Sequence, residues 1–189
     1  RLCFVGQDTF QAGRTAAGLM GEMTGGNGQV AIISGQVANP GLISRQKGFT
    51  TEIKESFPGI EVVDIRYSYD DEWVASKIVE ELLELYPDLT GIYITGHGVK
   101  GVCQTLQKLG KDKTMHVIAN DFLEENLKWL KEGTINFLIG QDAAVQGHSP
   151  VTILFQLLFD SKKPEKEFQY TDIVIRTLSL IHISEPTRP

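Results

Sequence analysis

The sequence is poor in cysteine, and this limits the kinds of site that it can build. Among 189 residues, only Cys3 and Cys103 are cysteines, and each lies inside an apolar run. A disulfide framework needs more cysteines, and a zinc site needs cysteine or histidine at ligand spacing. We therefore expect two small buried thiols, no bound metal and no other cofactor.

Long hydrophobic runs and an excess of basic residues are also missing. No apolar stretch approaches the roughly 18 residues that a membrane-spanning helix needs, so we expect no membrane association. The net charge of −6 argues against a nucleic-acid-binding surface on this piece of chain. With 41% hydrophobic and 22% charged residues, the composition suits one globular domain or two small lobes.

Neither end of the sequence resembles the natural end of a protein. The chain opens at Arg1 without a methionine and already inside a strand-like run, so we expect a truncated N-terminus. The absence of a targeting signal is then uninformative. Residues 178–189 resemble the conceptual translation of a transposase sequencing adapter, and we exclude them from the fold prediction.

The common catalytic motifs are absent as well. Residues 25–28 are rich in glycine, but no Gly-Lys-Ser/Thr follows them, so they do not form a P-loop. No Gly-x-Gly-x-x-Gly follows the first strand, and there is no Gly-x-Ser-x-Gly elbow. His97 stands alone between two glycines, and a single histidine is weak evidence for catalysis. These absences favour a binding protein over an enzyme.

Short β-rich runs alternate with helical stretches along the chain. The runs 30–33 and 91–94 are nearly continuous in apolar character, as strands buried on both faces require. Strands separated by helices predict an α/β fold, with a Rossmann-like parallel sheet covered by helices on both faces. Strands are expected at 2–6, 29–34, 60–67, 91–95, 115–119, 137–140 and 168–176, and helices at 10–23, 42–57, 70–85, 99–109, 124–132 and 145–159, with Pro150 in the first turn of the last helix.

Polar residues follow the predicted strands, where a parallel sheet binds its ligands. Carboxylates accept hydrogen bonds from hydroxyl groups, the planar guanidinium of an arginine donates paired hydrogen bonds, and side-chain amides both donate and accept. A small hydroxyl-rich molecule such as a sugar would therefore suit this edge. The alternative is that the aspartates only cap the following helices. The candidate ligand-binding residues are Asp8, Arg45, Asp70, His97, Asp121 and Gln141.

Five short segments together resemble a known family. They are Val5-Gly6-Gln7-Asp8, residues 45–49, residues 87–93, Asn120-Asp121, and Ile139-Gly140-Gln141 leading to Gln146-Gly147. In this order and spacing they resemble the type I periplasmic-binding-protein-like domains shared by sugar-binding proteins of transporters and LacI-type transcription regulators. The resemblance covers nearly all of residues 2–176.

The resemblance implies two Rossmann-like lobes joined by three crossovers, with the ligand in the cleft between them. Residues 1–7 would end the first lobe, 8–140 would form the second lobe, 141–167 would return to the first lobe, and 168–177 would be the final crossover strand, followed by the tail at 178–189.

The resemblance also implies roles for individual residues. Arg45 would hold ligand hydroxyls, Asp121 would accept from the sugar and Gln141 would reach the ligand from the second crossover. Residues 96–98 replace the Asn-Asp of the family, which suggests an unusual ligand or one held mainly by the other residues. An aromatic residue usually stacks on the sugar before the third helix, and this chain has Tyr69-Asp70 there.

Two functions are compatible with the resemblance. The first is the effector-binding domain of a LacI-type regulator, cytoplasmic and homodimeric, which would contact DNA only through a missing upstream domain. The alternative is an exported solute-binding protein of an ABC sugar importer, periplasmic or extracellular and lipid-anchored. The amino-acid sequences of residues 14–20 and 98–103 resemble those of the regulators. Two cysteines without partners also fit a reducing compartment.

Overall fold

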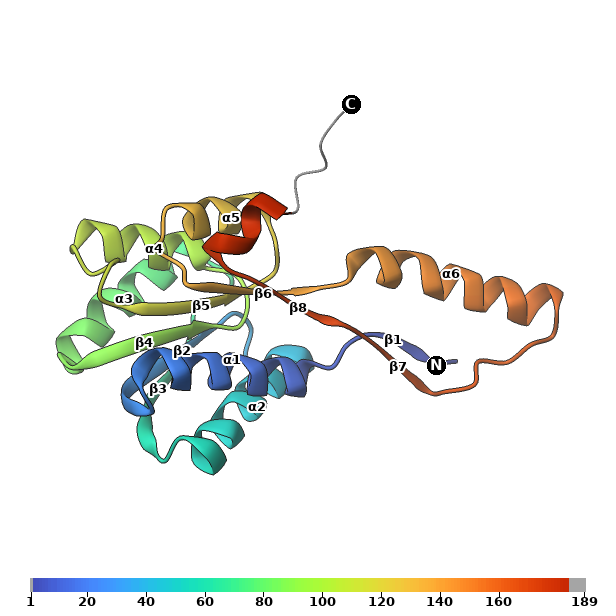
Figure 1. Cartoon of the computed structure of the whole chain (residues 1–189), viewed down its shortest axis with the longest axis horizontal. Helices are drawn as coiled ribbons and strands as arrows, with labels where there is room; N and C mark the ends of the chain where they lie inside the picture. The colour runs from blue at the N-terminus through green and yellow to red at the C-terminus, as the bar shows by residue number, and fades with distance from the viewer. Residues whose placement is uncertain (1, 184–189) are drawn as a thin grey trace.

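The computed structural model of the chain describes residues 2–183. Helices and strands alternate along most of its length (Figure 1). The strands are β1 (Phe4–Gln7), β2 (Asn27–Ser34), β3 (Gly59–Tyr67), β4 (Leu89–Ile94), β5 (His116–Asn120), β6 (Phe137–Gln141), β7 (Phe168–Thr171) and β8 (Ile173–Arg176). The helices are α1 (Thr9–Thr24), α2 (Pro40–Ser56), α3 (Glu72–Leu85), α4 (Val99–Lys108), α5 (Glu124–Lys131), α6 (Ala143–Phe159) and the 3-10 helix η1 (Leu178–Ile183).

The main sheet has six strands in the order β3-β2-β4-β5-β6-β8. All neighbours in it are parallel except β8, which runs antiparallel to β6. The prediction of an α/β fold with a mostly parallel sheet is confirmed. The single final strand predicted at 168–176 is instead divided at Asp172, because β7 pairs with β1 in a separate two-stranded sheet while β8 pairs with β6.

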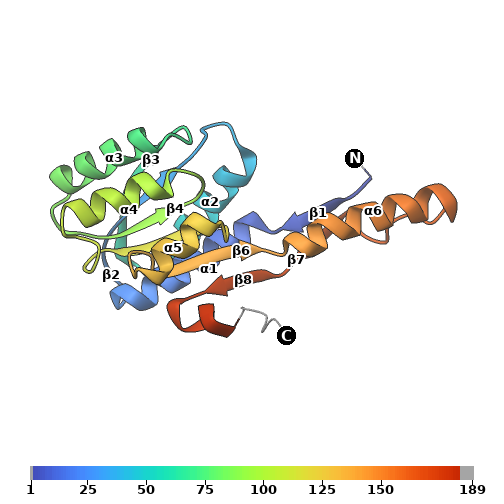
Figure 2. The same ribbon diagram turned by 90° about the horizontal axis from the view of Figure 1, so that it is seen from above.

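Helices cover both faces of the main sheet and form two apolar cores. Helices α1 and α2 lie on one face and α3, α4 and α5 on the other (Figures 1 and 2). Strand β2 supplies both cores, because successive side chains of a strand point to opposite faces. Val30 and Ile32 pack in the core under α1 and α2, while Ala31 and Ile33 pack in the core under α3 and α4.

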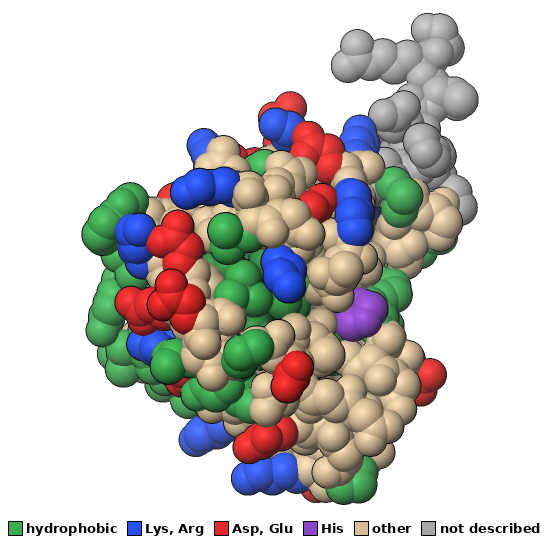
Figure 3. Space-filling model, turned by 90° about the vertical axis from the view of Figure 1, so that its left-hand side faces the viewer, with side chains coloured by type: hydrophobic (Ala, Val, Ile, Leu, Met, Phe, Trp, Pro, Cys, Tyr) green, Lys and Arg blue, Asp and Glu red, His purple; other side chains and the backbone are tan. Residues whose placement is uncertain are grey.

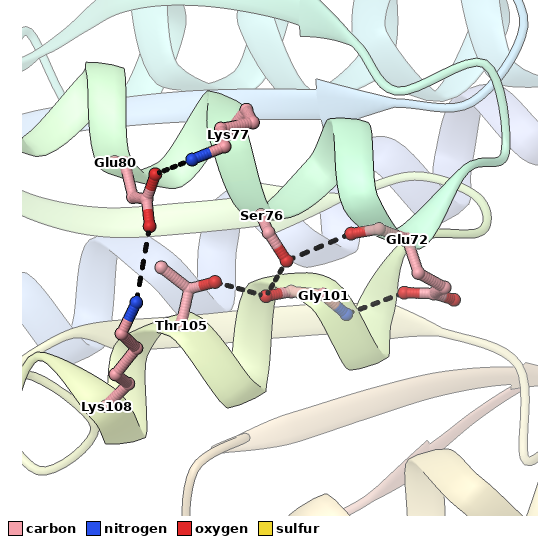
Figure 4. Close-up of polar contacts among 7 residues, drawn as sticks. All are labelled: Glu72, Ser76, Lys77, Glu80, Gly101, Thr105 and Lys108. Carbon is pink, nitrogen blue, oxygen red and sulfur yellow. Dashed lines mark hydrogen bonds and ion pairs between the residues drawn. The ribbon is translucent and has the colours of Figure 1, made fainter.

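The contact between α3 and α4 holds the start of α4 in place (Figure 4). Gly98 precedes α4 and offers no side-chain cap, but Glu72 of α3 accepts a hydrogen bond from the Gly101 amide at 2.6 Å. The hydroxyl of Ser76 donates to the Gly101 carbonyl at 3.2 Å. A Cβ at Gly101 would overlap the Glu72 carbonyl oxygen, so glycine permits this close approach. The loop at residues 96–98 is therefore anchored next to the carboxyl end of β4.

At the other end of the contact between α3 and α4, Figure 4 shows the ion pairs of Glu80 with Lys77 and Lys108.

Helix α6 projects away from the main sheet beside β1 and β7 (Figures 1 and 2). None of its residues is buried, although the helix is rich in large apolar side chains. The five large apolar residues of α6 that are more than half exposed are Val151, Leu154, Phe155, Leu158 and Phe159. In the described part of the chain, this side of α6 has an apolar surface without a covering layer.

The predicted start of α6 was too late. Asp142 caps the helix by accepting a hydrogen bond from the Val145 amide at 2.9 Å, so the helix begins at Ala143. Pro150 consequently lies in the helix interior and not in the first turn, where the prediction placed it. An interior proline removes one backbone hydrogen bond of the helix.

Candidate functional site

Two of the predicted ligand-binding residues meet at the carboxyl edge of the main sheet. Gln141, the last residue of β6, donates through Nε2 to Oδ1 of Asp121 at 2.9 Å. Asp121 directly follows β5, and both side chains are half-buried. Among residues 2–180, whose side chains the structure describes, only Oδ1 of this carboxylate has a hydrogen-bond partner, so Oδ2 is available as an acceptor.

The backbone of Asp121 adopts a left-handed conformation with φ of 68°. Such a conformation is uncommon outside glycine, although aspartate tolerates it better than most residues. Its amide donates to the Ile139 carbonyl at 2.8 Å, and the buried side chain of Asn126 donates to the carbonyls of Asn120 and Asp121. The turn is therefore held by three hydrogen bonds, two of them from Asn126, which restrict the direction of the Asp121 carboxylate.

Arg45 lies beneath this edge and braces the ends of three strands. Nη1 donates to the Thr95 carbonyl at 2.8 Å after β4, and Nη2 donates to Oε1 of Gln7 at 3.0 Å at the end of β1. Gln7 in turn donates to the Gly140 carbonyl of β6 at 3.0 Å. Arg45 is only 5% exposed. These contacts give Arg45 a bracing role, while its buried Nε has no hydrogen-bond partner among the described residues. The predicted contact of Arg45 with ligand hydroxyls stays a prediction.

The remaining candidates lie in different surroundings. Asp8 caps α1 by accepting from the Gln11 amide at 3.0 Å, as the capping alternative predicts. Asp70 is exposed and accepts from Gln36 at 2.9 Å, whereas α3 is capped by Asp71, so the predicted start of that helix at Asp70 was wrong. His97 is exposed and shares the lining of one small hollow with Asp121.

The sequence prediction did not include three residues that complete this region. Gln7, Asn126 and Gln146 all make hydrogen bonds with or next to the predicted site. Gln7 was recognised as following the first strand, and Gln146 belongs to a segment of the family resemblance. The partners of Gln7 lie 38 and 133 residues away, so the local pattern carried no signal of its contacts. Asn126 bonds residues five and six positions away, and Gln146 bonds Gln141 five positions away.

Tyr93 is a buried neighbour of the site without access to a ligand. Its ring stacks on Phe49 with centroids 4.8 Å apart, and its hydroxyl accepts from Nδ2 of Asn120 at 3.2 Å. Burial raises the pKa of Tyr93 above its ordinary value, while nearby Arg45 lowers it. The phenol therefore stays neutral and serves as a polar support beneath Asn120.

The described residues contain no cluster suited to metal binding. Among residues 2–180, whose side chains the structure describes, no group of three or more His, Cys, Asp or Glu could hold a metal ion. No helix in the same range is long and apolar enough to cross a membrane. On the end of the molecule farthest from α6, basic and acidic side chains are interspersed (Figure 3).

The two thiols differ in their environment. Cys103 is buried in the core under α3 and α4, as predicted, whereas Cys3 is only partly buried, so the prediction was wrong for Cys3. Burial is the main cause that raises the pKa of the Cys103 thiol, and nearby Glu72 adds to the effect. The reactive thiolate is therefore scarce at Cys103 at neutral pH.

We expect a thiol reagent such as DTNB at pH 8 to label Cys103 at least about 100-fold more slowly than Cys3 in the folded chain, because the raised pKa and burial both oppose thiolate attack. The release of thionitrobenzoate measures the two phases. Urea-unfolded protein is the control and should release both equivalents in the fast phase. Two fast equivalents from the folded chain would contradict the buried position of Cys103.

Comparison with known proteins identifies the family. Residues 1–163 match a sequence profile described as a periplasmic binding protein domain. The chain belongs to the periplasmic binding protein family. This membership confirms the prediction of a binding protein and not an enzyme. The match does not show the more specific resemblance to LacI-type regulators.

Individual members of the periplasmic binding protein family show the same fold. The chain is 25% identical over 184 residues to the D-allose-binding periplasmic protein of Escherichia coli K12, covering 92% of this chain and 58% of that protein. A solute-binding protein of an ABC transporter from Burkholderia graminis, solved in complex with D-arabinose, is 30% identical with a TM-score of 0.89, covering 100% of this chain and 65% of that one. A glucose-galactose binding protein from Geobacillus stearothermophilus is 24% identical with a TM-score of 0.89. The match covers 96% of this chain and 64% of that one. The chain thus spans less than two thirds of the length of these relatives.

Proposed function

We propose that the chain is the larger part of a sugar-binding protein that delivers its ligand to an ABC importer. The observation that carries the proposal is the Asp121–Gln141 pair at the carboxyl edge of the sheet, in a chain of this family. A fixed carboxylate with one available oxygen accepts hydrogen bonds from ligand hydroxyls, and charge-assisted bonds of this kind are strong. The Burkholderia graminis relative in complex with D-arabinose supports a sugar as the ligand.

The transporter function is better supported than the LacI-type regulator. The relatives described above are a periplasmic sugar-binding protein, an ABC transporter solute-binding protein and a glucose-galactose binding protein, and none of these three is a transcription regulator. We therefore propose a location outside the cytoplasmic membrane. The cytoplasmic location, homodimer and DNA-binding domain stay predictions of the regulator hypothesis. A signal peptide encoded upstream of Arg1 would support the transporter, and a helix-turn-helix there would contradict it.

The exposed apolar side of α6 agrees with this proposal. Relatives of this chain are longer by about a third of their length, and Val151, Phe155 and Phe159 expose more than half of their surface in the described chain. Contiguous apolar patches on proteins usually mark an interface. We propose that the rest of the parent protein packs on α6 and closes over a ligand held at Asp121.

Asp121→Asn should weaken sugar binding about 30-fold, which corresponds to about 2 kcal/mol for a lost charge-assisted hydrogen bond. Asparagine tolerates the left-handed backbone at this position, so the turn should persist. The measurement is calorimetric titration of D-arabinose, and then of D-allose and D-tagatose, into the full-length protein that carries this chain.

Asp8→Asn is the matched control for this experiment. Asparagine caps a helix as well as aspartate does, so the affinity should change less than about threefold if Asp8 only caps α1. Unchanged affinity in Asp121→Asn would contradict the assigned site. A wild-type protein that binds none of the three sugars in the millimolar range would contradict the proposed function for these ligands.

A further inference from the structure

A series of hydrogen bonds leads from Asp121 away from the main sheet. Nε2 of Gln141 donates to Oδ1 of Asp121 at 2.9 Å, and Oε1 of Gln141 accepts from Nε2 of Gln146 at 3.1 Å. Nε2 of Gln146 also donates to Oγ1 of Thr171 at 3.3 Å. All four side chains are half-buried. We refer to Asp121, Gln141, Gln146 and Thr171 as the relay.

The relay crosses between two parts of the structure. Asp121 follows β5 of the main sheet and Gln141 ends β6, whereas Gln146 lies on α6 and Thr171 ends β7 of the small sheet. The chain passes between these two parts directly after Gln141 and directly after Thr171. Any change in the angle between α6 and the main sheet would therefore alter the distance from Gln146 to Gln141.

The direction of donation makes each amide depend on its neighbour. A glutamine side chain donates from Nε2 and accepts at Oε1. Because Gln146 donates to Oε1 of Gln141, it fixes the orientation in which Nε2 of Gln141 faces the Asp121 carboxylate. The opposite orientation would place the carbonyl oxygen of Gln141 against an ionised carboxylate, which is unfavourable. Gln146 and the Asp121 carboxylate thus favour the same orientation of Gln141, and Gln146 supports it from the side away from the site.

We infer that Gln146 is a positioning residue that holds Gln141 and Asp121 in the arrangement that binds a sugar, and that it couples this site to the angle of α6. The inference rests on the proposed function, because it assigns Gln146 a role in ligand binding through Asp121. A helix residue that only stabilised α6 would have no reason to act through Gln141.

A double-mutant cycle tests the inference in the full-length protein, with D-arabinose as the first probe and D-allose and D-tagatose as the next. Gln146→Met removes the donor at similar side-chain size, and we expect it to weaken binding about fivefold, the effect of one neutral hydrogen bond. Gln141→Met should weaken binding more. The double variant should bind no more weakly than Gln141→Met alone, because Gln146 acts through Gln141.

Gln156→Met is the control, since Gln156 lies on the same helix and its side chain has no hydrogen-bond partner among the side chains that the structure describes, residues 2–180. It should leave the affinity unchanged. Equal losses in Gln146→Met and Gln156→Met, or a Gln146→Met loss that persists fully in the Gln141→Met background, would overturn the inference.

A measurement without a sugar separates this inference from the proposed function. In ¹H–¹⁵N spectra, the side-chain amide signal of Gln141 should move in Gln146→Met and stay in place in Gln156→Met. An unmoved Gln141 signal in Gln146→Met overturns the inference, whatever the ligand proves to be. Absence of binding by the wild-type protein, together with a moved signal, would contradict the proposed function and leave the control of Gln141 by Gln146 supported.

Discussion

Arg45→Ala should lower the free energy of unfolding by about 4 kcal/mol, because it leaves two buried carbonyl oxygens without donors. The two oxygens are those of Thr95 and of the Gln7 side chain, which the guanidinium bonds at 2.8 and 3.0 Å. Removal of the Arg45 side chain would also weaken the hydrogen bond of Gln7 with the Gly140 carbonyl of β6. Urea unfolding followed by far-ultraviolet circular dichroism measures the change.

Two further variants show whether the loss is specific to the brace. Arg45→Lys keeps the charge but cannot reproduce the planar fork, so it should be intermediate. Arg14→Ala removes an arginine whose ion pairs with Glu52 and Glu55 lie nearer the surface, and should cost about 1 kcal/mol or less. An Arg45→Ala protein of wild-type stability that has lost sugar binding would show that Arg45 is a ligand contact, as the family resemblance implies, and not a brace.

Gly13→Ala should destabilise the chain by about 3 kcal/mol, a large effect for one methyl group. A Cβ at Gly13 would overlap the carbonyl oxygen of Arg45, and a Cβ at Gly48 would overlap the carbonyl oxygen of Phe10, so α1 and α2 pack through a reciprocal pair of glycines. The atoms in the way are backbone atoms, which cannot move aside without separating the helices. Thermal unfolding of Gly13→Ala and Gly48→Ala should show comparable losses.

Gly18→Ala is the matched control on the same helix. A Cβ at Gly18 would meet no atom within 4 Å, and alanine is favoured over glycine in a helix by about 1 kcal/mol. This variant should therefore melt at the same or a higher temperature than the wild-type chain. Equal destabilisation by Gly13→Ala and Gly18→Ala would mean that the α1–α2 contact is looser than the structure indicates. The contacts of Gly13 and Gly48 also affect the site, because the Gly13 contact holds α2 at Arg45.

The local pattern of residues was enough to predict the elements of the main sheet and its edge. The run Val30-Ala31-Ile32-Ile33 predicted a strand buried on both faces, and its residues do alternate between the two cores. Asp121 and Gln141 were predicted as neighbours of one ligand because carboxyl ends of parallel strands meet at one edge. Their hydrogen bond at 2.9 Å agrees with that reasoning. These features depend on spacing along the chain, which a single sequence displays.

Features that depend on distant partners were decided by the tertiary structure alone. Arg45 contacts Gln7 and Thr95 across separations of 38 and 50 residues, and no local pattern records such contacts. Residues 168–176 were divided because β1 pairs with one half and β6 with the other. The sequence thus determined which residues form strands, helices and a polar edge. Which polar residues are accessible at the edge and which are buried beneath it was decided by packing, because burial and long-range hydrogen bonds arise only when the segments meet.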